Sequence, residues 1–231
     1  PLADYARSIS SLIGELRQCG GWQQALYIAE CLEARANHGD THVAPNQMLY
    51  NAILAVLADT GRSVEAAALL ERMRQRGFEL RSRSYALAVR ATSSITEALT
   101  LVHDYEAVAA VRSPGGVADD DDAAFVFSAA MRACVRGGAW GEALLLYERM
   151  RSNGVQTDAH CTAAMLEACR AGRQWERARD ELARVKPHLL SGFHYSIAMG
   201  TCLRCAQWQE ALTLFESYAA SLGDSGAPDE Y

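Results

Sequence analysis

The sequence has no long apolar run. None of its apolar stretches approaches the roughly 18–20 residues that a membrane-spanning helix needs. The longest candidate, residues 52–58, ends at Asp59. We therefore expect a soluble protein without a membrane partner. Because the sequence opens with Pro1 rather than methionine, we also expect the natural N-terminus to lie upstream.

Positive charge is also scarce. The formal net charge is −6, and Lys186 is the single lysine among the 231 residues. A strongly basic chain of the kind that binds nucleic acid throughout its surface is excluded. Arginines are nevertheless grouped locally, and an arginine fork suits phosphate and carboxylate groups. The two groups are Arg72, Arg74, Arg76, Arg81 and Arg83, and Arg170, Arg173, Arg177, Arg179 and Arg184.

Catalytic and metal-binding motifs are missing as well. The sequence contains no Ser-His-Asp spacing, phosphate-binding loop or dinucleotide-binding turn, and its six histidines do not cluster with metal-ligand spacing. Cys202 and Cys205 form a C-x-x-C without a second ligand pair, so we expect core packing there. The seven cysteines lie in helix-like segments and are expected to be reduced and buried. We predict a protein that is not an enzyme and has no catalytic residue, metal or cofactor.

What the sequence does contain is tryptophan in a fixed context. Each of the four tryptophans is followed three residues later by alanine. The pairs are Trp22 and Ala25, Trp140 and Ala143, Trp175 and Ala178, and Trp208 and Ala211. The last three tryptophans are 35 and 33 residues apart, the period of helical-hairpin arrays. Ser63 with Ala66 and Ile95 with Ala98 fill the same frame in the long gap after Trp22. We call these six starting positions (22, 63, 95, 140, 175 and 208) the anchors.

Each anchor predicts the start of an amphipathic helix. Residues 3, 4, 7 and 10 positions after an anchor are mostly apolar, which is the spacing of one helix face. A second apolar segment precedes most anchors, as at 48–58, 125–135, 161–169 and 195–203, and glycines separate the two segments at Gly61, Gly137, Gly138 and Gly172. The pattern predicts helical hairpins, with exposed loops at 37–46 and 112–122. We expect each tryptophan to fill the wedge between the two helices of its own hairpin, with the alanine permitting close approach.

Two of the units resemble the pentatricopeptide repeat. The marks in residues 47–81 are Tyr50-Asn51, Gly61-Arg62, Glu65-Ala66, Met73 and Gly77. The marks in residues 124–158 are Gly138, Glu142-Ala143-Leu144, Met150, Gly154 and Asp158. The tetratricopeptide repeat has a similar period, but its tryptophan lies in the first helix rather than at the start of the second.

The resemblance implies an all-α, right-handed α-solenoid of about six tandem hairpins over residues 1–226. The expected units are 6–41, 47–81, 82–115, 124–158, 159–191 and 192–226, followed by a tail at 227–231.

The resemblance also implies function. In this family single-stranded RNA is read at about one base per repeat, by the fifth residue of the first helix together with the last residue of the repeat. The matching candidates here are Asn51 with Arg81, Ser128 with Asp158, and Ser196. Ser128 with Asp158 is the pair best suited to a base edge, and the expected base is a purine. Ala86 and Ala163 hold the fifth position in their units and cannot hydrogen-bond a base.

A long RNA code is therefore not expected. The interpretation we favour is an RNA-associated scaffold, or a structural or assembly component of a mitochondrial ribosome or RNA-processing complex, located in the matrix. Its partners would be single-stranded RNA or rRNA and other proteins of that assembly. Two alternatives remain open: an autonomous sequence-specific RNA-binding protein, and a helical-repeat adaptor that binds only proteins.

Overall fold

The computed structural model describes residues 2–38, 45–112 and 123–223. Every regular element in these ranges is helical, which confirms the all-α prediction. The elements are α1 (Leu2–Cys19), α2 (Trp22–Asn37), α3 (Gln47–Thr60), α4 (Ser63–Gln75), α5 (Ser82–Ala91), α6 (Ile95–Arg112), α7 (Ala123–Arg136), α8 (Trp140–Ser152), α9 (Ala159–Gly172), α10 (Trp175–Arg184), the short 3₁₀ helix η2 (Pro187–Leu189), α11 (Gly192–Arg204) and α12 (Trp208–Gly223). The predicted tail and most of the two predicted loops lie outside the described residues.

All six anchors are the first residues of helices, as the apolar periodicity predicts. The preceding helices are started and stopped by local chemistry. The side chains of Asn46 and Asp158 accept the backbone N–H of Leu49 and Cys161, at 2.9 and 2.6 Å, and so cap α3 and α9. Gly61 ends α3 with φ of 67°, a left-handed conformation that glycine adopts without steric cost.

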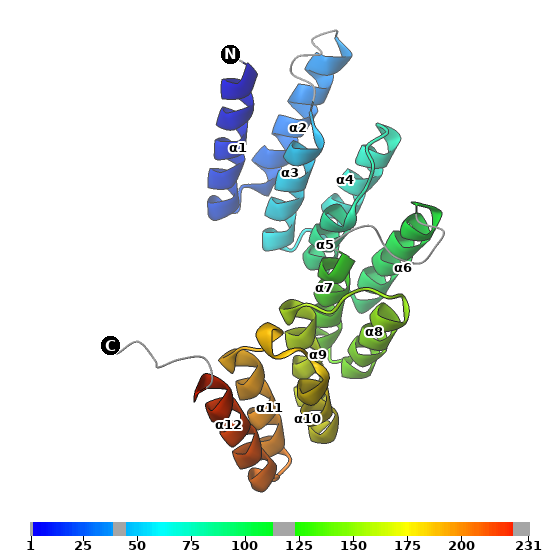
Figure 1. The fold of residues 1–231 in the computed structure, drawn as a ribbon. Helices are drawn as coiled ribbons and strands as arrows, with labels where there is room; N and C mark the ends of the chain where they lie inside the picture. The colour runs from blue at the N-terminus through cyan, green and yellow to red at the C-terminus, as the bar shows by residue number, and fades with distance from the viewer. Residues whose placement is uncertain (1, 39–44, 113–122, 224–231) are drawn as a thin grey trace, which may run out of the picture.

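The helices form two rows (Figure 1). The odd-numbered helices pack against one another in chain order from α1 to α11, and Figure 1 shows α4, α6, α8 and α10 along the outer side of the arc that they make. Each even-numbered helix from α2 to α10 contacts both the odd-numbered helix before it and the one after it. This stacking buries a continuous core between successive hairpins, and the predicted solenoid of helical repeats is confirmed.

The alanines of the repeated pattern have the predicted place in this core. Ala25, Ala66, Ala98, Ala143 and Ala178 have no exposed surface, and Ala211 is 7% exposed. A methyl group at this position leaves the two helices of a hairpin close together, so a larger side chain there would separate them.

The predicted position is wrong for two of the four tryptophans. Trp140 is 36% exposed and Trp208 is 57% exposed, so neither fills a wedge inside its own hairpin. The ring of Trp140 lies against Gly172 at the end of α9, where a Cβ atom would come within 2.5 Å of the ring. Ile95 occupies the corresponding position against Gly137, where a Cβ would meet its side chain at 2.6 Å. These two anchors thus pack on the turn of the following unit.

Gly172 is therefore needed for space rather than for backbone conformation. The left-handed residue that ends α9 is Arg173, with φ of 54°. Trp22 shows a related contact, because the Arg62 guanidinium lies 4.5 Å from its ring centroid, just after α3. The sequence pattern located the aromatic residue on the helix correctly, but it carried no information on which neighbour the ring would cover.

The cysteines agree with the sequence prediction only in part. Cys134, Cys161, Cys169 and Cys202 are fully buried, and burial raises the pKa of Cys169 to about 12. Cys19 is exposed, and Cys31 and Cys205 are half-buried. All seven are free thiols, as expected.

Buried carboxylates join the outer helices of successive units. Glu33 of α2 accepts a hydrogen bond from Tyr50 Oη at 2.7 Å and lies 2.6 Å from Arg72 and 3.3 Å from Arg76. Glu181 of α10 accepts a hydrogen bond from Tyr147 Oη at 2.6 Å, with Arg151 at 3.5 Å. A paired carboxylate next to a buried tyrosine explains why these charges are tolerated inside the stack.

Candidate nucleic-acid interface

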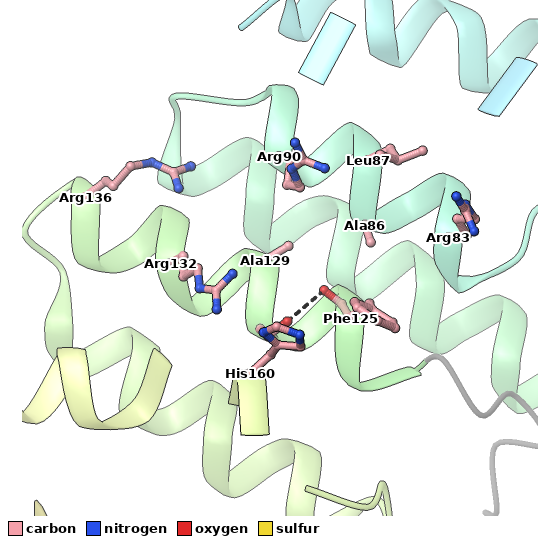
Figure 2. Close-up of a pocket in the computed structure, with 10 residues that line it drawn as sticks. Arg83, Ala86, Leu87, Arg90, Phe125, Ala129, Arg132, Arg136 and His160 are labelled. Carbon is pink, nitrogen blue, oxygen red and sulfur yellow. Dashed lines mark hydrogen bonds between the residues drawn. The ribbon is translucent and has the colours of Figure 1, made fainter. Parts of the chain in front are cut away.

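A groove of about 630 Å³ lies on the inner row of helices, where α5, α7 and α9 stand side by side (Figure 2). Its lining comes from α5 (Arg83, Ala86, Leu87 and Arg90), α7 (Phe125, Ser128, Ala129, Arg132 and Arg136) and α9 (His160). Figure 2 shows the arginines extending from α5 and α7, with the small side chains of Ala86 and Ala129 between them. Small side chains thus form the floor of the groove, and arginines form its sides.

The groove is positive although the chain as a whole is acidic. Arg90 is paired with Asp59 of α3 at 2.6 Å. Arg83, Arg132 and Arg136 have no ion-pair partner within residues 2–38, 45–112 and 123–223. Arginine side chains left without a carboxylate are available to neutralise the phosphates of a nucleic acid backbone.

Two aromatic rings accompany these charges. Phe125 is 45% exposed, and its ring centroid lies 6.0 Å from that of the exposed His160, with 36° between the ring planes. Unstacked bases bind to exposed aromatic faces regardless of sequence, since every base has a π-face. The pair therefore offers a stacking surface at the edge of the basic groove.

These rings belong to a position that repeats along the chain. Phe125 and His160 are the second residues of the units 124–158 and 159–191. The same position holds Met48 with 76% exposure, Arg83, and Phe193 with 59% exposure in other units. A large exposed side chain at this place in consecutive units gives the inner row of helices a series of contact points.

The predicted base-reading residues differ in their exposure and in their partners within the protein. Asn51 is half-buried, and its side-chain oxygen accepts a hydrogen bond from Ser84 Oγ of α5 at 2.8 Å. Arg81 is exposed and lies 3.4 Å from Glu79. Ser196 is exposed on α11. Their base-reading roles stay predictions.

Ser128 and Asp158, the best-suited pair, are both engaged within the protein. Ser128 lines the groove but is only 3% exposed, and its hydroxyl donates to the Phe125 carbonyl at 3.2 Å, the bond dashed in Figure 2. Asp158 is half-buried and caps α9 through the Cys161 N–H. Contact with a base would require both side chains to exchange these partners, and the predicted pairing stays a prediction.

Sequence reasoning missed most of the groove. Phe125, Arg132 and Arg136 are spaced seven and four residues apart, which places them on one face of α7. This helical spacing could have indicated from the sequence that the three side chains share a surface. The neighbouring contributions of Arg90 and His160 depend on α5 and α9 packing beside α7, which no local pattern specifies.

The described residues provide neither a metal-binding cluster nor a membrane span. Within residues 2–38, 45–112 and 123–223, no three His, Cys, Asp or Glu side chains are grouped so that they could hold a metal ion. No helix in this part of the chain is long and apolar enough to cross a membrane.

Comparison with known proteins agrees with this geometry. The family model of the PPR repeat matches residues 48–78 and 125–155. No curated protein matches the chain. Among solved structures, the pentatricopeptide repeat protein PPR10 from maize is 24% identical, with a TM-score of 0.59 over 92% of this chain. PPR10 in complex with an 18-nt psaJ RNA element is 23% identical, with a TM-score of 0.60 over 96% of this chain.

The chain is therefore a solenoid of helical repeats. It contains pentatricopeptide repeats, since two of its units match the model of the PPR repeat in sequence. It spans 29% of the length of the PPR10 chains to which its fold is similar.

Proposed function

We propose that this protein binds single-stranded RNA in its basic groove and acts as an RNA-associated scaffold, or as a structural or assembly component of a mitochondrial ribosome or RNA-processing complex, in the mitochondrial matrix. The observation that supports the proposal most is the groove of α5, α7 and α9. It combines an exposed aromatic pair with arginines that have no ion-pair partner among the described residues. The similarity of the fold to PPR10, which is solved with an RNA element, supports the same class of ligand.

The chemistry of the groove favours the RNA backbone over a long base code. Arg132 and Arg136 would neutralise phosphates, and Phe125 with His160 would stack against bases. Groups that read base edges are scarce by comparison. Ala86 and Ala163 carry no polar side-chain atom, and the hydroxyl of Ser128 is already bonded. Binding of this kind gives affinity with little sequence preference, which suits a scaffold.

The groove is tested by Arg132→Ala combined with Arg136→Ala. We expect this double variant to lose about tenfold or more in affinity for a short single-stranded RNA, measured by fluorescence anisotropy. The slope of log affinity against log salt should also become shallower by about 0.7 for each phosphate that is no longer neutralised. Arg177→Ala is the matched control, because Arg177 lies on α10 and is paired with Glu148 at 2.6 Å. Equal affinity of the double variant and the control would contradict RNA binding in this groove.

Localisation and assembly need a separate experiment. A tagged full-length protein is purified from mitochondria, and the associated RNA and proteins are identified by sequencing and mass spectrometry. Co-purification with ribosomal or RNA-processing components supports the scaffold. A free monomeric pool that binds one defined RNA sequence, with a preference altered by Ser128→Ala or Asp158→Ala, would instead favour an autonomous sequence reader.

A further inference from the structure

A small basic pocket lies where two successive connections between units meet. Its volume is about 170 Å³. One wall comes from the end of α8 and the turn before α9, and the other comes from the end of α10 and η2. The charged residues of the lining are Arg151, Arg184, Lys186 and Glu181. Three positive charges thus face a single carboxylate.

The carboxylate of Glu181 leaves these cations incompletely paired. Glu181 is buried, and one of its oxygens accepts the hydroxyl of Tyr147 at 2.6 Å. The other oxygen lies 3.5 Å from Arg151 and 3.7 Å from Arg184. Charge-assisted N–H···O bonds are typically about 2.7–2.9 Å long, so neither guanidinium is closely bonded to this oxygen. Because a guanidinium has five N–H donors, both arginines keep donors for a second anion.

The related cluster near the start of the array is balanced instead. Glu33 also accepts a tyrosine hydroxyl, but it lies 2.6 Å from Arg72 and 3.3 Å from Arg76. Glu30 lies a further 3.8 Å from Arg72. Two carboxylates there face two arginines. The excess of positive charge at the pocket is therefore not a general consequence of burying a carboxylate in this stack.

Further donors surround the two arginines. Lys186 is exposed and has no ion-pair partner among the residues that the structure describes. His188 can donate from a ring nitrogen and Thr157 from its hydroxyl, and both line the pocket. Asp158 follows Thr157 in the chain, but its carboxylate accepts the Cys161 N–H at 2.6 Å and is not part of the lining. The pocket therefore has the chemistry of an anion site.

We propose that this pocket binds the phosphate monoester at an end of the RNA strand. A phosphate monoester carries a charge of about −1.5 to −2 at pH 7, which matches three cations set against one carboxylate. An internal phosphate of the strand carries a single negative charge. The volume also suits one phosphate group, since sites for drug-sized molecules measure roughly 300–1,000 Å³.

The position of the pocket favours RNA over other phosphorylated molecules. Thr157 precedes His160 by three residues, so their Cα atoms are at most about 11 Å apart. His160 lines the basic groove of α5, α7 and α9. A strand that leaves this groove beside His160 can therefore place its end in the pocket. The inference rests on the RNA binding proposed above, to which it adds a preference for phosphorylated ends.

The pocket is tested with one short single-stranded RNA in three forms: with a 5′-phosphate, with a 3′-phosphate, and with hydroxyl groups at both ends. Affinities are measured by competition with a labelled RNA. We expect one phosphorylated form to bind about tenfold more tightly than the hydroxyl form, because hydrogen bonds to charged groups contribute a factor of this size. The comparison of the two phosphorylated forms identifies the end that is bound.

A double variant locates the preference in the pocket. Arg184→Ala combined with Lys186→Ala should abolish the tenfold difference, while the melting temperature stays unchanged because both side chains are exposed. Arg35→Ala combined with Arg177→Ala is the matched control. It also removes two positive charges, from an exposed residue of α2 and from the partner of Glu148, and neither lines the pocket. The control should keep the full difference.

The outcomes separate the pocket from the groove. Failure of the groove appears as weak binding of all three RNA forms, with no further loss in Arg132→Ala combined with Arg136→Ala. Failure of the pocket appears as equal affinity for the three forms, or as an equal loss of preference in the control, and either result would overturn the inference. So would a phosphoserine peptide that depends on Arg184 and Lys186 when the RNA end confers no advantage, since the pocket would then belong to a protein partner.

Discussion

The two units that match the family model, 47–81 and 124–158, have the same core and different inner surfaces. In the first, polar groups are bonded within the protein, as with Asn51 to Ser84 and Asp59 to Arg90. In the second, Arg132 and Arg136 have no ion-pair partner among the described residues and extend into the groove. The residues that define the repeat thus fix the stack, and the remaining positions of the inner face determine what a unit binds.

The shared core predicts equal losses in the two units. Met73 and Met150 occupy the same place and have no exposed surface. We expect Met73→Ala and Met150→Ala each to lower the free energy of unfolding by about 2–5 kcal/mol. Chemical denaturation followed by circular dichroism measures both. Losses of stability that differ by more than the experimental error would show that the two cores are packed differently.

The different inner surfaces predict unequal losses of RNA affinity. Phe125→Ala should weaken binding of a single-stranded RNA by about 1–3 kcal/mol, since it removes a base-stacking ring. Met48→Ala, at the same position in unit 47–81, should have a smaller effect because that residue lies outside the groove and is not aromatic. Anisotropy titrations of both variants at one salt concentration make the comparison. An equal loss in both would contradict the contrast between the two inner surfaces.

The buried tyrosines predict a decrease in stability at alkaline pH. Burial, then the hydrogen bond to Glu181, raises the pKa of Tyr147 above its ordinary value of 10, and burial followed by Glu33 does the same for Tyr50. A raised pKa in the folded state means that this stability is fully present below pH 10 and is lost as pH rises further. We expect a lower denaturation midpoint at pH 11 than at pH 8.

Phenylalanine substitution measures the contribution of each tyrosine to the loss of stability at alkaline pH. Tyr147→Phe and Tyr50→Phe should each reduce the loss between pH 8 and pH 11, at a cost of about 0.5–1.5 kcal/mol at pH 8 for the missing hydrogen bond. If neither variant reduces the loss, the alkaline transition arises elsewhere.

The smallest expected effect concerns the helix caps. Asn46 caps α3 and Asp158 caps α9 with the same hydrogen bond, so Asn46→Ala and Asp158→Ala should each cost about 1 kcal/mol of stability. Asp158 is also a predicted base-reading residue. A change in base preference in Asp158→Ala, absent from Asn46→Ala, would show a role in RNA recognition beyond capping. Equal behaviour of the two variants would identify Asp158 as a cap alone.

Much of the fold could be predicted from the sequence because its determinants are local. The apolar residues that follow Trp140 or Ile95 recur at helical spacing, and each anchor does begin a helix. The contact of the Trp140 ring could not be predicted, since Gly172 lies in another hairpin and the pattern has the same form whichever neighbour the ring covers.

The groove was less predictable than the fold for a similar reason. Its surface is made by α5, α7 and α9 together, and the pairing of Arg90 with Asp59 removes one charge that a count of arginines would include. The hydrogen bond from Ser84 to Asn51 likewise joins residues 33 positions apart. Sequence alone predicted that the first helices of the hairpins form the contact surface, but which of their side chains are free and which are engaged follows from tertiary packing.

The contact of three anchors with the next unit has a mechanical consequence. Three of the joints between units are held by a large side chain on the following turn: Trp22 on Arg62, Ile95 on Gly137, and Trp140 on Gly172. Ser63, the smallest anchor, provides only a hydroxymethyl group at the joint between α4 and α5. The array should therefore bend and begin to separate at this joint, so that residues up to 81 and residues from 82 onward exchange their amide hydrogens as two cooperative blocks.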